Sequence, residues 1–262
     1  MPEPAGSPRR RFAWIALAVY ALLLATSTIW VASRPGGQAD ASDERLRLPV
    51  MTADGPMGNG SMRLRVHDWG AARPGTPAVV LLHGSPGDGA GFGLLAPELA
   101  RGGYHVLAPD LPGFGDSDKD LPDLSARAHA HAVLAMLDAM GIERAHVVGW
   151  SNGGAVALWL AELSPDRTAS LTLMASVGDQ RTEGSGSYSF EHSKYKLGLA
   201  AFALARWLVP HFGLLDRNDV AWLRNFDDSD QRPLTAIMRT TRVPTLILHG
   251  RHDFLTPAWG AE

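Results

Sequence analysis

The chain has 262 residues, 45% of them hydrophobic, and a formal net charge of −3. This length and composition predict a globular protein with one sizeable core, and the scattered basic residues exclude a basic nucleic-acid-binding protein, since the only tight run is Arg9-Arg10-Arg11. There is no cysteine, which excludes disulfides, a thiolate nucleophile and a cysteine metal site.

The N-terminal segment Phe12 to Ala32 is uncharged over 21 residues and follows the arginine run. A transmembrane helix needs about 20 apolar residues, so we expect a membrane anchor at residues 12–32. The positive-inside rule places a basic N-terminus, residues 1–11, in the cytoplasm and the chain after a linker, residues 33–45, outside. The alternative is a signal cleaved near Val31-Ala32-Ser33, which would leave a secreted or periplasmic protein.

Beyond the linker, the hydrophobic pattern predicts an α/β protein. Residues 46–69 are expected to form two antiparallel strands, with turn residues at Asp54-Gly55 and Met57-Gly58-Asn59-Gly60. Apolar runs then alternate with helical patterns, which predicts a mostly parallel sheet flanked by helices. The expected strands are 78–82, 104–109, 146–148, 171–176 and 243–248, and the expected helices are 92–101, 124–140 and 155–163.

The alternation breaks between Gly178 and Arg242, which marks an insertion of about 65 residues. Within it, residues 197–205 are apolar nearly all round a helix. We expect this stretch to be buried beneath other residues of the insertion, and the alternative is that it faces lipid or acyl chains.

Ser151 stands in the segment Gly149-Trp150-Ser151-Asn152-Gly153-Gly154, between an expected strand and an expected helix. A serine with glycines two residues before and after it, on a strand-to-helix turn, is typical of a catalytic nucleophile. The small neighbours are needed because the turn is strained, and the helix directs its positive end toward a negatively charged intermediate. The competing interpretation is a glycine-rich turn with an incidental serine.

The loop after the first parallel strand, His83-Gly84-Ser85-Pro86-Gly87, is also rich in glycine. Such a loop is able to present a backbone N–H to an oxyanion, but Pro86 has none to donate. We therefore predict that the N–H of Ser85 and the N–H of Asn152, directly after the serine, form an oxyanion hole.

Four segments, taken in order, resemble the α/β-hydrolase family from about Leu46 to the last residue. They are H-G-x-P-G at 83–87, D-x-P-G-x-G-x-S at 110–117, G-W-S-x-G-G at 149–154 and G-x-x-D-x-x-x-P at 250–257. The resemblance implies an α/β-hydrolase core at 46–178, a helical cap at 179–242 and a continuation of the core at 243–262.

The same resemblance implies a triad with Ser151 as nucleophile and Asp253 as acid. Asp179, after the strand 171–176, is the alternative acid, and its competing interpretation is an ordinary loop or helix-cap aspartate. Relatives that act on haloalkanes or epoxides carry aspartate at the nucleophile position, so a serine implies a small-molecule acyl substrate: an ester, thioester or amide. No cofactor and no metal are implied.

The family's catalytic histidine follows one more strand, but this chain has nine residues after Asp253. We therefore expect a truncated hydrolase without its last strand and helix, with an exposed sheet edge and with weak or no activity. Other histidines are poor substitutes: His83 and His249 are expected to shape loops, His252 adjoins Asp253, and His129 and His131 are expected to be solvated helix residues. The alternative function is a non-catalytic acyl-binding or interaction protein on the same scaffold, and the sequence does not indicate an oligomeric state.

Overall fold

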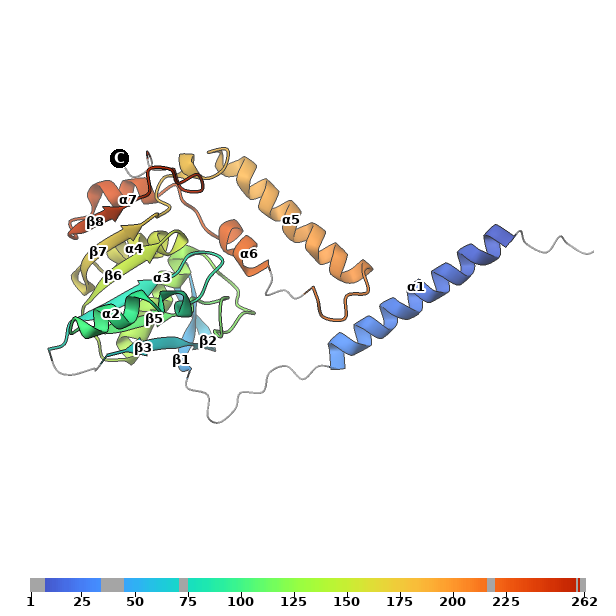
Figure 1. Ribbon diagram of the computed structural model, residues 1–262, viewed down its shortest axis with the longest axis horizontal. Coiled ribbons are helices and arrows are strands. Elements are labelled where there is room, and N and C mark those ends of the chain that lie inside the picture. Colours follow the sequence, from blue (N-terminus) through green and yellow to red (C-terminus); the bar gives the residue numbers. More distant parts are fainter. Residues whose placement is uncertain (1–7, 34–44, 71–74, 216–219, 258, 260–262) are drawn as a thin grey trace, which may run out of the picture.

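The computed structural model describes residues 8–33, 45–70, 75–215, 220–257 and 259. Its main sheet has the strand order β3-β5-β4-β6-β7-β8, in which β3 is antiparallel to β5 and all other pairs are parallel (Figure 1). The mostly parallel sheet predicted from the sequence is thereby confirmed. The strands are β3 (Val66–Trp69), β4 (Ala78–Leu82), β5 (His105–Pro109), β6 (Ala145–Trp150), β7 (Thr168–Met174) and β8 (Thr245–Leu248).

Helices cover both faces of the central strands. All five residues of β4 are buried, because Val80 and Leu82 face the cluster that includes α3 (Ala126–Ala139) and α4 (Asn152–Leu163). Val79 and Leu81 face the opposite side, where Phe92 and α2 (Leu95–Arg101) cover the sheet. A continuous apolar run is what a strand buried on both faces requires.

Residues 46–69 form three strands, where the sequence analysis expected two. The strands β1 (Leu46–Thr52) and β2 (Gly55–Leu64) make a separate antiparallel hairpin that turns at residues 53–54. Val66–Trp69 leaves the hairpin as β3 and pairs with β5 at the edge of the main sheet. Residues 66–69 form a separate strand because they pair with β5, which is distant in the sequence. A local alternation of apolar residues does not predict such a pairing.

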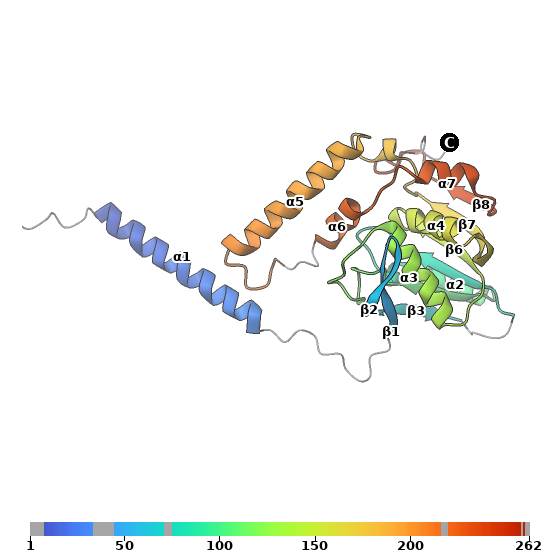
Figure 2. The ribbon, with the colours of Figure 1, turned by 180° about the vertical axis from the view of Figure 1, so that it is seen from behind.

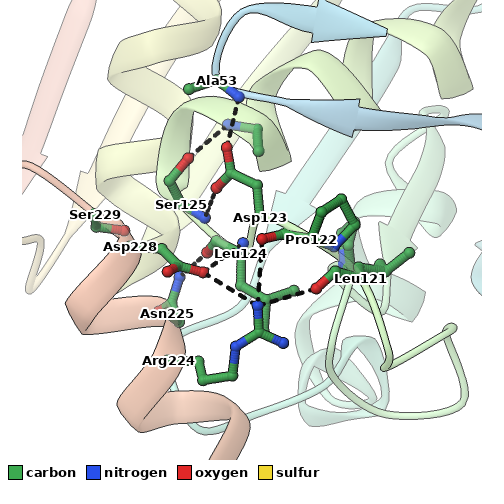
Figure 3. A network of polar contacts seen from close by, with 12 residues as sticks. Ala53, Leu121, Pro122, Asp123, Leu124, Ser125, Arg224, Asn225, Asp228 and Ser229 are labelled. Carbon is green, nitrogen blue, oxygen red and sulfur yellow. Dashed lines mark hydrogen bonds and ion pairs between the residues drawn. The ribbon is translucent and has the colours of Figure 1, made fainter. Parts of the chain in front are cut away.

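The segment between β7 and β8 forms the helices α5 (Tyr188–Leu208), α6 (Ala221–Asp228) and α7 (Leu234–Thr240). The cap helix α6 is fastened to the segment that enters α3 by a network of polar contacts (Figure 3). Asp228 accepts a hydrogen bond from the N–H of Leu124 at 2.9 Å, and Ser229 accepts one from the N–H of Ala126 at 3.0 Å.

The helix α5 is much more exposed than the sequence analysis expected. Leu197 is 71% exposed and Leu204 is 56% exposed, so the expected burial of residues 197–205 is wrong. One side of α5 packs on α6, and its last residue, Leu208, contacts Tyr20 of α1, whereas large apolar side chains such as Leu197 and Leu204 are left exposed by the described residues.

The N-terminal helix α1 (Pro8–Ser33) contains the stretch Phe12–Ser33, which is long and apolar enough to cross a membrane. It is the one such helix in the described part of the chain. Most of the expected cytoplasmic N-terminus, residues 1–11, and of the linker, residues 33–45, lies outside the described residues.

Among the described strands, β8 is the edge opposite β3, and it pairs with β7 alone. All four of its residues are exposed, including Leu246 at 53% and Leu248 at 48%. An exposed apolar edge is what the sequence analysis expected at this end of the sheet.

Candidate active site

Ser151 is the residue between β6 and α4, and its backbone has an unusual conformation. Its φ is 53° and its ψ is −120°, a region that a residue with a side chain rarely adopts. The N–H of Ser151 donates to the carbonyl oxygen of Met174 at the end of β7, at 3.0 Å. The strain is thus held in place at the carboxyl edge of the sheet, which is typical of functional sites.

Glycines around Ser151 are required by close backbone packing. A Cβ on Gly153 would lie 2.2 Å from the carbonyl oxygen of Leu82, and a Cβ on Gly149 would lie 2.5 Å from that of Gly153. A Cβ on Gly154 would lie 1.7 Å from the hydroxyl of Ser176. The physical reason given for the motif from the sequence therefore agrees with the geometry.

The loop after β4 lies against the serine. A Cβ on Gly84 would be 3.1 Å from the Cβ of Ser151, so the two loops are in close contact. No described residue accepts a hydrogen bond from the N–H of Ser85 or from that of Asn152. Both predicted oxyanion donors are therefore available, one beside the serine turn and one at the first residue of α4.

His83 fixes the loop after β4 to the loop after β5. Its Nδ1–H donates to the carbonyl oxygen of Gly84 at 2.7 Å, and its Nε2 accepts a hydrogen bond from the N–H of Leu111 at 2.9 Å. This pattern requires the neutral ring, and burial lowers the pKa of His83. The loop-shaping role expected for His83 agrees with these contacts.

Asp110 organises the D-x-P-G-x-G-x-S segment, a role that the sequence analysis did not assign. It is 2% exposed, and its carboxylate accepts hydrogen bonds from the N–H groups of Gly89 and Asp116, both at 2.7 Å. His67 contacts the same carboxylate at 3.0 Å. Gly115 in the motif is explained as well, because a Cβ there would lie 2.1 Å from a carboxylate oxygen of Asp110.

His129 is fully buried, so the expectation that it is solvated is wrong. Its Nε2–H donates to the carbonyl oxygen of Pro112 at 2.9 Å, and Nδ1 has no partner among the described residues. Burial, with a smaller contribution from His83, lowers the pKa of His129 to about 3. His129 is therefore a neutral anchor for the loop after β5. The helical pattern of α3 did not show this, because the covering loop comes from a distant part of the sequence.

Asp253, the predicted acid, lies in the loop after β8. Its carboxylate accepts hydrogen bonds from the N–H of Leu255 at 2.9 Å, the N–H of Thr256 at 3.0 Å and the hydroxyl of Thr256 at 2.9 Å. Hydrogen bonds from Thr256 and Leu255 outweigh burial and hold the pKa of Asp253 below its ordinary value. The Thr256 hydroxyl also lies 3.2 Å from the carbonyl oxygen of Ala175, which places this loop at the edge where Ser151 stands.

Asp179, the alternative acid, is occupied by a local partner. Its carboxylate caps a short 3-10 helix, Gln180–Thr182. Both carboxylate oxygens also accept hydrogen bonds from the guanidinium of Arg181, at 2.6 to 3.1 Å. These contacts hold the pKa of Asp179 below its ordinary value. The geometry therefore favours the helix-cap interpretation of this residue.

All ten histidines lie among the described residues, and none of them forms a hydrogen bond with Ser151. His252 is exposed, and His249 contacts the carbonyl oxygen of Thr256 and lies 3.8 Å from Asp253. Seven other histidines form hydrogen bonds elsewhere: with acidic side chains (His67, His105), with backbone groups (His83, His129, His192, His211) or with a serine hydroxyl (His146).

The side chain of Asn152 links the serine turn to the cap. Its amide donates to the side-chain oxygen of Asn225 on α6 at 2.9 Å. Asn225 in turn donates to the carbonyl oxygen of Leu124 at 2.6 Å, a contact drawn in Figure 3. Both asparagines are buried. This pair could not be predicted from the sequence, because its members are 73 positions apart.

A cavity of about 680 Å³ lies beside the cap, and Ser151 is not among the residues that line it. It lies between α5, α6 and the segment before α3 and is partly open to solvent. Its lining includes Lys119, Leu124, Leu199, Phe202, Arg206 and Arg224. Among the described residues, no group of three His, Asp or Glu side chains is arranged to hold a metal ion.

Comparison with known proteins agrees with this geometry. A family model described as the alpha/beta hydrolase fold matches residues 77–207, half of the chain. The chain belongs to the α/β-hydrolase fold family. This α/β-hydrolase is 34% identical over 221 residues to 2-hydroxymuconate semialdehyde hydrolase of Pseudomonas sp. (strain CF600), with 75% of the chain and 76% of the relative covered.

A second relative of this α/β-hydrolase is 2-hydroxy-6-oxo-6-phenylhexa-2,4-dienoate hydrolase of Burkholderia cepacia. It is 40% identical over 127 residues, which cover 46% of the chain and 42% of the relative, so the chain spans less than half of that protein. Among solved structures, an α/β-hydrolase fold protein of Burkholderia ambifaria has a TM-score of 0.59 at 24% identity, with 76% and 81% of the two chains covered, and it shows the fold alone. Both of these relatives are named as hydrolases, which supports a hydrolytic role for this α/β-hydrolase.

Proposed function

We propose that this chain is a serine hydrolase in which Ser151 attacks the carbonyl carbon of a carboxylic ester, thioester or amide. The observation that carries the proposal is the strained backbone of Ser151 between β6 and α4, with glycines where no Cβ fits. Such a turn presents a hydroxyl at the edge of the sheet beside the first N–H groups of a helix.

In the proposed reaction, the Ser151 oxygen forms a bond to the carbonyl carbon and loses its proton to a base. The negative charge that develops on the carbonyl oxygen is held by the N–H groups of Ser85 and Asn152. The tetrahedral intermediate then expels the alcohol, thiol or amine, which takes up a proton, and water releases the acyl group by the same route. Asp253 would orient and stabilise a histidine that acts as the base.

None of the ten histidines is bonded to Ser151, and a serine without a base is a weak nucleophile. We therefore propose that the chain reacts slowly, through the oxyanion donors and Ser151 alone. The same observation supports the alternative function: a non-catalytic protein that binds an acyl ligand on this scaffold.

A fluorophosphonate probe distinguishes these functions. We expect slow labelling of the purified chain, lost in Ser151→Ala and retained in Ser61→Ala, which removes an exposed serine of β2. Rapid labelling would show that a base reaches Ser151 and that activity is not weak. No labelling of folded protein, together with retained binding of a fatty acid, would favour the acyl-binding alternative.

The substrate class is tested with a panel of p-nitrophenyl esters of increasing acyl length. We expect a preference for apolar acyl groups, because the cap helix α5 is rich in apolar residues. A separate assay uses 2-hydroxymuconate semialdehyde, the compound in the name of one relative, which is not an ester. Uniformly poor turnover of apolar esters by a labelled, folded protein would contradict the preference.

We further propose that α1 is an uncleaved membrane anchor, with the remainder of the chain outside the cytoplasm. The supporting observations are the apolar length of Phe12–Ser33 and the arginines before it. Extraction of membranes with alkaline carbonate tests this: an anchored chain stays in the pellet at full length. A shorter chain in the soluble fraction would show a cleaved signal and would leave a secreted or periplasmic protein.

A further inference from the structure

The helix α5 has two faces with different surroundings. Its inner face lines the cap cavity with residues that include Leu199, Phe202 and Arg206. Its outer face is apolar and uncovered among the described residues. The exposed side chains on this face and on the segment that follows are Leu197 at 71%, Leu204 at 56%, Trp207 at 75%, Leu208 at 40%, Val209 at 47% and Leu214 at 83%.

An apolar surface of this kind marks an interaction site, because soluble proteins rarely expose several large apolar side chains together. The charges on α5 indicate the kind of partner. Lys194 and Lys196 are exposed, and the only acidic residue of the helix, Glu191, is buried and paired with Lys194. Large apolar residues beside exposed lysines are typical of a helix that lies in a membrane surface containing anionic lipids.

The end of α5 is joined to the candidate membrane helix. The hydroxyl of Ser27 on α1 accepts hydrogen bonds from the N–H groups of His211 and Phe212, at 2.9 and 2.8 Å. Tyr20, two helical turns earlier on α1, donates to the carbonyl oxygen of Leu208. Ser27 is 1% exposed, so this contact is closed on all sides.

This contact sets the depth of α5 relative to α1. Ser27 is six residues before the end of α1 at Ser33, which is about 9 Å along the helix axis. Interfacial helices bury their apolar face by about 5–10 Å. Figures 1 and 2 show the carboxyl end of α5 near α1, with α5 inclined steeply to α1 and the sheet on the far side of α5 from the amino-terminal half of α1.

We propose that the outer face of α5 lies on the lipid bilayer that α1 crosses, so that the cap is a second, interfacial membrane contact. The proposal rests on the anchoring by α1 proposed above and not on the chemistry of Ser151. The bilayer then covers the apolar side chains that the described residues leave open. The exposed lysines meet the headgroups.

The chain's lack of cysteine permits a direct test with single labels on the full chain. Leu204→Cys and, as a second position, Leu197→Cys carry an NBD fluorophore on the outer face of α5, and each variant is reconstituted in nanodiscs that hold one copy. Lipids with a doxyl group on the acyl chain quench a fluorophore that lies in the bilayer. Asp166→Cys, at an exposed residue after α4, is the matched control, and Leu22→Cys, 68% exposed on α1, reports insertion of the anchor.

We expect quenching at positions 204 and 197 to a similar extent as at position 22, and none at position 166. Quenching at position 22 without quenching at 197 and 204 would overturn the proposal and leave the anchor intact. A blue-shifted but unquenched label on α5 would show that another part of the same chain covers this face, and it would also overturn the proposal. Absence of quenching at all positions would refute both the anchor and the docking.

Discussion

The two sides of the candidate active site are built in different ways. On the serine side, backbone atoms enclose the turn so tightly that a Cβ on Gly153 would lie 2.2 Å from another residue's carbonyl oxygen. On the acid side, a Cβ on Gly250, just before the Asp253 loop, would meet nothing within 4 Å, and every residue of β8 is exposed. The position of the serine is therefore set by packing, whereas that of the acid is set by a few hydrogen bonds.

The largest difference in the free energy of unfolding between the two sides is expected when a glycine on each side is replaced by alanine. Gly153→Ala forces a clash with backbone that cannot move without shifting β4, so we expect a loss of several kcal/mol in the free energy of unfolding, about 4 or more. Gly250→Ala, the matched change on the acid side, is expected to cost little. Thermal unfolding in detergent measures both, and an equal effect of the two changes would refute the contrast.

The buried His129, which lies on α3 and anchors the loop after β5, predicts sensitivity to acid. The native pKa of His129 is about 3 against an ordinary value of 6.5, so between these values the unfolded chain binds a proton that the native chain does not. Stability is therefore lost as the pH falls below 6.5, by about 1.4 kcal/mol per pH unit and about 2 kcal/mol at pH 5.

His129→Gln removes this titration and keeps a donor for the carbonyl oxygen of Pro112. We expect a flatter dependence of the unfolding free energy on pH between 6.5 and 4, measured by urea titration at several pH values. His252→Gln, at an exposed position, is the control and should leave the slope unchanged. A slope in His129→Gln equal to that of the wild type would contradict a neutral, buried His129.

The link between the serine turn and the cap predicts an intermediate effect. Asn225→Ala leaves the amide of Asn152 and the carbonyl oxygen of Leu124 buried without their partner, which costs about 1–3 kcal/mol. Asn59→Ala, at an exposed residue of β2, is expected to change little. If the two variants unfold at the same temperature, the cap is not fastened through Asn225.

The smallest effect is expected on the acid side. Thr256→Val removes the hydroxyl that bonds Asp253 and Ala175, so the pKa of Asp253 rises toward its ordinary value and stability falls by about 1 kcal/mol. A lowered carboxyl pKa stabilises the fold above the ordinary value, and this contribution is lost as the pH falls. Carboxyl NMR titration checks the shift, with Thr240→Val, on α7, as the control.

The sequence predicted the serine side well, because its determinants are local. Glycines at fixed positions around Ser151, between a strand and a helix, carry the geometry directly, and the parallel strands of the sheet follow from the alternation of apolar runs with helical patterns. The α/β-hydrolase fold and its hydrolytic relatives agree with that reading. The roles of Ser151, Ser85, Asn152 and Asp253 stay predictions.

The features that sequence analysis missed depend on contacts between distant segments. His129 has the spacing of a surface helix residue but is covered by the loop at Pro112. Asn225 forms a hydrogen bond with Asn152, 73 positions earlier in the sequence. Similarly, β3 is a strand distinct from the hairpin because it pairs with β5 of the main sheet. For α5 the apolar composition was visible, but composition alone does not distinguish a helix covered by protein from one that faces lipid.

The contact proposed between α5 and a bilayer has a kinetic consequence. A substrate that dissolves in the membrane would reach the protein by lateral diffusion, so its effective concentration is its mole fraction among the lipids rather than its amount per volume of water. Adding inert lipid at constant substrate would then slow the reaction by surface dilution. For a water-soluble ester, the same addition would leave the rate unchanged.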